Sequence, residues 1–128
     1  MRRLFFFALL IPFVVNASNW MFIAASSNTK FYLETSSIQK DGDTVNFWIR
    51  ENLSNRSKLG YLSSKTNQIF DCKRRERKII YASFFEDLDN NGRKISQFSQ
   101  AELGNPAWSP IPPDSVAEDI LKSVCKTK

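Results

Sequence analysis

Short segments of alternating apolar and polar residues occupy most of the chain beyond Asn19. Successive side chains of a strand point to opposite faces, so this alternation predicts β-strands. The clearest segment is Thr44–Arg50, in which the odd-numbered residues Val45, Phe47 and Ile49 would share one face. The other segments expected as strands are Trp20–Ala25, Lys30–Glu34, Ser37–Lys40, Thr66–Cys72, Lys78–Glu86 and Arg93–Ser99.

Turn residues separate these segments. Asp41-Gly42 stands between two of them and predicts a type I′ hairpin, which requires positive φ at both central residues. Asn90-Asn91-Gly92 predicts a second turn, and the polar stretch Asn52–Lys58 predicts a loop. Strands joined in sequence by short turns indicate an antiparallel meander.

The C-terminal part has a different pattern. Four prolines between Gly104 and Pro113 exclude regular structure there. A helix should then begin, because Ser115 can cap it and Glu118, three residues later, completes a capping box. Its apolar face would carry Val116, Ile120, Leu121 and Val124. The predicted fold class is therefore α+β, an antiparallel meander with a C-terminal helix packed on it.

The first residues resemble an export signal. Arg2 and Arg3 precede the uncharged, almost wholly apolar run Leu4–Val15, and Ala17 suits signal-peptidase cleavage. The run is shorter than the ~20 residues of a membrane-spanning helix, and a proline interrupts it, so an uncleaved anchor is less favoured. We expect a signal peptide at residues 1–17 and one domain at residues 18–128, with no membrane span. No cysteine follows Ala17 as a lipid acceptor, so we expect an exported protein, periplasmic or at the cell surface, without a lipid anchor.

Composition limits the chemistry that the domain can perform. The 18 basic and 13 acidic residues give a formal net charge of +5, and loss of Arg2 and Arg3 would lower it to +3. So small an excess does not favour a nucleic-acid partner. The chain has no histidine, which excludes Ser-His-Asp and Cys-His arrangements. We therefore expect no enzyme, no catalytic residues and no cofactor.

One segment matches the first half of a calcium-binding loop. Asp87–Gly92 follows the pattern D-x-D-x-N-G, but the twelfth position is Phe98, where a bidentate glutamate should stand. A polar turn without a metal accounts better for this segment.

Cys72 and Cys125 are the only cysteines. Two cysteines in a small exported domain most simply form a disulfide, which here would attach the C-terminal helix to the sheet. Closing so long a loop would stabilise the fold by about 4 kcal/mol. A metal or redox pair is the alternative, disfavoured by the long separation and the lack of histidine.

The densest charge cluster comprises Lys73, Arg74, Arg75, Arg77 and Lys78. It is either a solvated hairpin tip that opposes aggregation or a patch for an acidic protein or a sulfated glycan. The tryptophans, Trp20, Trp48 and Trp108, are interpreted as core and sheet-face aromatics rather than a ligand cage.

From about Trp20 to Cys125, the chain carries a set of short motifs in order. They are Trp20, Tyr32–Ile38, Val45–Trp48, Asp71-Cys72, Trp108–Ser115 and Val124-Cys125. Together they resemble the surface-adhesin protein E family of bacterial exported proteins. The resemblance implies an antiparallel sheet with a C-terminal helix packed on it, and it also implies that Cys72 and Cys125 pair.

The resemblance further implies a non-enzymatic binding module. The member after which the family is named looks like an adhesin. That member binds host matrix and serum proteins such as vitronectin and laminin, and it forms dimers. That member is lipid-anchored, and this chain departs from it because no cysteine follows Ala17. Lys73–Lys78 is the expected place of ligand contact. The alternative function is a soluble periplasmic structural or stress-related protein with no host ligand.

Overall fold

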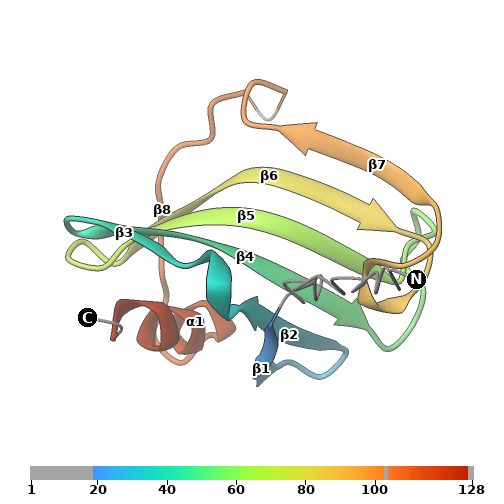
Figure 1. Ribbon diagram of the computed structural model, residues 1–128, viewed down its shortest axis with the longest axis horizontal. Helices are drawn as coiled ribbons and strands as arrows, with labels where there is room; N and C mark the ends of the chain where they lie inside the picture. Colours follow the sequence, from blue (N-terminus) through green and yellow to red (C-terminus); the bar gives the residue numbers. More distant parts are fainter. Residues whose placement is uncertain (1–18, 103, 127–128) are drawn as a thin grey trace, which may run out of the picture.

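A computed structural model describes residues 19–102 and 104–126, which form one antiparallel sheet with one helix on one of its faces (Figure 1). The expected signal peptide, residues 1–17, lies outside the described residues. The predicted fold class is confirmed. The strands are β1 (Trp20–Ala25), β2 (Thr29–Glu34), β3 (Gln39–Asp41), β4 (Thr44–Leu53), β5 (Ser63–Asp71), β6 (Glu76–Phe85), β7 (Lys94–Ser99) and β8 (Ser109–Pro110).

The main strands follow the predicted meander, in the spatial order β1-β2-β4-β5-β6-β7. The short strand β3 pairs with β4, and β8 pairs with β6. Short 3-10 turns, η1 (Thr35–Ser37) and η2 (Leu88–Asn90), join β2 to β3 and β6 to β7. The polar segment predicted as a turn near Asn90 is therefore a turn, in which both Asp89 and Asn90 have positive φ.

Two local predictions are wrong. Of the residues around the β3–β4 turn, only Gly42 has positive φ (61°), and Asp41 pairs with Thr44, so the turn is not of type I′. Glycine at the first central position is typical of a type II′ turn instead. The segment Gly104–Pro113 was expected to lack regular structure, but Ser109–Pro110 pairs with Arg77 and Glu76 of β6. Proline is tolerated there because β8 is a two-residue strand at the edge of the sheet.

The core lies between the sheet and the helix α1 (Val116–Cys125). The alternation in β4 places Val45, Phe47 and Ile49 on the helix side, and each is at most 1% exposed. The rings of Phe47 and Phe70 pack edge to face, with their centroids 4.9 Å apart. The helix contributes its predicted apolar face, including Ile120, Leu121 and Val124, together with Ala117.

The start of α1 follows the capping prediction in one half only. The Ser115 hydroxyl accepts a hydrogen bond from the Glu118 amide (3.1 Å), as an N-cap serine should. The Glu118 carboxylate, however, accepts from the Asp114 amide (3.4 Å) and not from that of Ser115. Within the described residues, α1 is too short to cross a membrane, and no other helix is long and apolar enough to do so.

Candidate functional site

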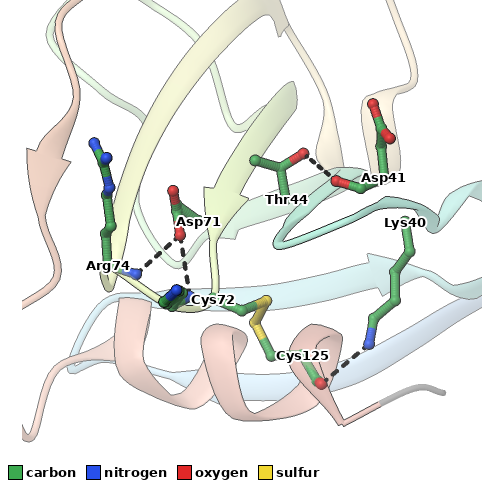
Figure 2. Close-up of a disulfide and its surroundings, with 8 residues drawn as sticks. Lys40, Asp41, Thr44, Asp71, Cys72, Arg74 and Cys125 are labelled. Atoms are coloured by element: carbon green, nitrogen blue, oxygen red, sulfur yellow. Dashed lines mark hydrogen bonds between the residues drawn. A yellow bond between two sulfur atoms is a disulfide. The ribbon is translucent and has the colours of Figure 1, made fainter.

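The basic turn between β5 and β6 is ordered by a carboxylate at its start. Asp71 accepts hydrogen bonds through Oδ1 from the backbone amides of Lys73 (3.0 Å) and Arg74 (2.9 Å), as Figure 2 shows for this region. Aspartate at the start of a turn favours this geometry because its short side chain reaches the amides that follow. Arg75 takes positive φ (54°) and reverses the chain before Glu76 pairs with Asp71.

A covalent link fixes this turn to the end of the helix. Cys72 and Cys125 form a disulfide whose Cα atoms are 5.9 Å apart (Figure 2). The Cys72 amide also donates to the Asp43 carbonyl (2.8 Å) in the neighbouring β3–β4 turn. From that hairpin, the Lys40 ammonium donates to the Cys125 carbonyl (3.2 Å). The two hairpin tips and the end of α1 therefore form one connected end of the molecule (Figure 1).

The five cations predicted as one ligand patch divide into four groups. Lys73 and Arg74 are exposed at the tip, and neither side chain has an acidic partner among residues 19–102 and 104–126. Arg75 is bound to the Glu118 carboxylate of α1. Arg77 pairs across the sheet with Phe70 and so faces the helix side, whereas Lys78 lies 4.7 Å above the Trp108 ring. Only the first group is a free cationic tip.

Glu118 connects the basic turn to the helix electrostatically. Partial desolvation would raise the pKa of Glu118, but hydrogen bonds from the Asp114 amide, Lys122 and Arg75 outweigh it, so its pKa lies below the usual value. Because the pKa is lowered in the folded state, Glu118 stabilises the fold at neutral pH. That stabilisation is lost as the pH falls through the lowered pKa.

The Glu118→Gln variant is therefore expected to lose less stability on acidification than the wild type, because glutamine cannot be protonated. The difference between the two pH profiles of the free energy of unfolding should develop below about pH 4, near the ordinary glutamate pKa, because only the wild type is protonated at residue 118. Urea denaturation across a pH series measures it. The control is Glu102→Gln, which removes an exposed carboxylate outside any ion pair of the described chain. Parallel pH profiles for Glu118→Gln and wild type would contradict the assignment.

The sheet face opposite α1 carries a row of rings and cations that the sequence did not reveal. The Arg50 guanidinium lies 4.2 Å from the Trp20 ring centroid, and the Lys65 ammonium lies 4.8 Å from that of Trp48. Trp48 also contacts the Tyr81 ring edge to face, at 5.5 Å. Cations placed over aromatic faces are attracted by the ring electrons, so this row stabilises the sheet. The prediction that Trp20 and Trp48 are sheet-face aromatics is confirmed.

Trp108 differs from that prediction. It precedes β8 at the sheet edge and remains 37% exposed, so it is neither a core residue nor a sheet-face residue. Next to it, Ala107 and Ser109 line a cavity of about 510 Å³, together with Arg77 and Lys78. Two of the five predicted ligand residues therefore belong to a groove that is separate from the basic tip.

The acidic residues near η2 are engaged in contacts within the fold. Asp89 lies 3.8 Å from Arg50 and accepts a hydrogen bond from the Asn52 amide group (2.8 Å), while Glu86 lies 3.6 Å from Arg93. In the described part of the chain, no group of three or more histidine, cysteine, aspartate or glutamate side chains is placed to hold a metal ion.

Comparisons with known proteins agree with this architecture. A structure of Haemophilus influenzae protein E superposes with a TM-score of 0.62 at 15% sequence identity, covering 85% of each chain. A crystal structure of protein E from non-typeable Haemophilus influenzae gives a TM-score of 0.59 at 16% identity, covering 91% of this chain and 81% of the other. At such low identity, these similarities show a shared fold. No curated protein sequence matches this chain.

A sequence profile gives the more specific result. The profile of the surface-adhesin protein E family matches residues 20–126, which is nearly the whole of the described structure. The match begins at β1 and ends just after Cys125, so it includes the sheet, the helix and the disulfide. This chain therefore belongs to the surface-adhesin protein E family.

Proposed function

We propose that this protein is an exported, non-enzymatic, adhesin-like module that recognises a host matrix or serum protein through the tip of its basic turn. The observation that carries the proposal is the exposure of Lys73 and Arg74 on a fixed turn, without acidic partners in the described chain. Membership of a surface-adhesin family supports a protein partner.

The turn is suited to binding because its conformation is fixed beforehand. Asp71 holds the backbone of the tip, and the disulfide holds the turn against α1. A preorganised turn loses little conformational entropy when a partner binds. Two exposed cations favour an acidic surface on that partner and accelerate the encounter through long-range attraction.

The double variant Lys73→Ala/Arg74→Ala is expected to bind immobilised vitronectin or laminin roughly twofold to thirtyfold more weakly than the wild type, since exposed ion pairs contribute about 0.2–1 kcal/mol each. Its affinity should also depend less on salt, because screening acts on the charges removed. Surface plasmon resonance at several salt concentrations measures both effects.

The matched control is Lys30→Ala/Lys58→Ala, which removes the same charge from two exposed sites outside the basic turn. It should retain wild-type affinity and salt dependence. Equal weakening in the two double variants would mean that only net charge matters, and the tip would then not be the binding site. Absence of binding by the wild type to either protein would remove this proposed function.

The cellular location of the protein distinguishes this function from the alternative, that of a periplasmic structural or stress-related protein. The proposal includes cleavage after Ala17 and display at the cell surface without a lipid anchor. Protease added to intact cells should then degrade the protein, and the mature form should begin at residue 18. Protection from protease until the outer membrane is opened would favour the periplasmic alternative.

Self-association is also part of the proposal. β1 is an edge strand, and its Met21 and Phe22 side chains are 48% and 53% exposed. Exposed apolar residues on an edge strand favour pairing with a second chain. Sedimentation velocity of the mature protein should show a dimer, whereas a monomer at all concentrations would contradict this part.

A further inference from the structure

A groove lies at the outer edge of β6, where two partner strands leave a gap. β7 pairs with β6 from Tyr81 onward, and β8 pairs with it at Glu76 and Arg77, so residues 78–80 lie between the two. Pro106 and Ala107, in the connection from β7 to β8, form the opposite wall. The cavity between these walls measures about 510 Å³, within the range of small-molecule sites.

The lining of this groove is mostly carbon. Its apolar residues are Ile79, Ala82, Phe84, Phe98, Pro106 and Ala107. Phe98 remains 40% exposed, so its ring presents apolar surface to the groove. The ring of Phe84 contacts the rings of Tyr61 and Phe98, with centroid separations of 4.7 Å and 6.1 Å. These contacts hold the aromatic wall of the groove in place.

The polar lining residues are Ser109 and two cations, Arg77 and Lys78, and none of the carboxylates in residues 19–102 and 104–126 lines the groove. Lys78 is held over the Trp108 ring, a contact that positions the ammonium without neutralising it. Arg77 attracts Glu51 on the helix side of the sheet, but the two form no ion pair within 4.0 Å. The groove therefore combines an apolar wall with two cations, of which Arg77 is partly balanced by Glu51 on the helix side.

We propose that this groove binds a linear alkyl carboxylate, that is, a free fatty acid. The alkyl chain would lie against Phe84 and Phe98, and the carboxylate would accept hydrogen bonds from Arg77 and Lys78. A peptide pairing with the unpartnered edge of β6 at residues 78–80 is the alternative occupant, which the experiments below distinguish. This inference is independent of the proposed function, because it does not involve Lys73 or Arg74.

Isothermal titration calorimetry with dodecanoate and with dodecyltrimethylammonium tests the charge requirement. The two probes share the same alkyl chain and carry opposite charges. Dodecanoate is expected to bind to the intact domain at one site, and the cationic probe is not. Equal binding of the two probes, or no binding of dodecanoate, would overturn the proposal.

Two groove variants test whether dodecanoate binds in this groove. Arg77→Gln/Lys78→Gln should weaken dodecanoate binding by about tenfold or more, because charge-assisted hydrogen bonds are the stronger kind. Ala107→Trp, at an exposed residue, should block the groove without disturbing the core. The matched control, Lys73→Gln/Arg74→Gln, removes equal charge from the same hairpin and should bind as the wild type does. Circular dichroism confirms that each variant is folded.

Three results would count against a fatty acid in this groove. Dodecanoate binding that survives both groove variants would place the ligand elsewhere. Binding only of an apolar peptide with a free C-terminal carboxylate would identify a peptide groove instead. A dimer that binds no dodecanoate and that Ala107→Trp dissociates would identify a second copy of the chain as the occupant.

Discussion

Replacing Phe47 with alanine is expected to lower the free energy of unfolding by about 3–5 kcal/mol. Phe47 is fully buried between the sheet and α1, and its ring packs against that of Phe70. Truncation removes this buried apolar surface and leaves a cavity that rigid neighbours fill poorly. Domains of this size are typically stable by about 5–15 kcal/mol, so the variant should be marginally folded.

Urea denaturation followed by circular dichroism measures this loss. Leu59→Ala is the control, because Leu59 is 78% exposed in the connection between β4 and β5. Its substitution should change the free energy of unfolding by no more than about 0.5 kcal/mol. If the two variants were equally stable, the core would not be centred on β4 as described.

Removing the disulfide is expected to have an effect of similar size. Cys72 and Cys125 are 53 residues apart, so the Cys72→Ala/Cys125→Ala variant should lose about 4 kcal/mol through the greater freedom of its unfolded chain. The helix is expected to depend on this link more than the strands do. A ten-residue helix is marginal by itself in water, and the bond attaches its last residue to the sheet.

The control for this prediction is the redox state of the solvent. A reductant should lower the unfolding midpoint of the wild type to that of the double variant and should leave the variant unchanged. Hydrogen exchange should also show earlier opening of α1 than of β4 and β5 in the variant. Unfolding of the wild type that is insensitive to reductant would mean that the bond contributes little to stability.

The regular elements were predictable because each depends on local patterns. Alternation along Thr44–Arg50 identified β4 and its buried face, and Ser115 with Glu118 identified the start of α1. The turn at Gly42 and the pairing of β8 were not predicted correctly. Both depend on which residues pair across neighbouring strands. β8 pairs with β6 only because the tertiary fold brings the chain back beside the outer edge of β6.

In the candidate site, too, local features were predictable from the sequence and tertiary contacts were not. The sequence identified the five cations of the β5–β6 hairpin but placed them in one patch. Strand alternation separates Arg77 from its neighbours, whereas Glu118 and Trp108, which engage Arg75 and Lys78, come from distant parts of the chain. Contacts of this kind depend on tertiary structure, so a cluster of like charges in one segment did not predict its partners.

The disulfide also determines how the domain responds to mechanical load. Because Cys72 and Cys125 are covalently joined, tension applied to the two ends of the chain bypasses the 53-residue span between them. That span would otherwise lengthen by roughly 180 Å, at about 3.4 Å per extended residue. The basic turn, β6, β7 and most of α1 belong to the bypassed span. Under such tension, the strands before Cys72 would carry the load while the basic tip kept its shape, a property that suits the adhesin-like function proposed above.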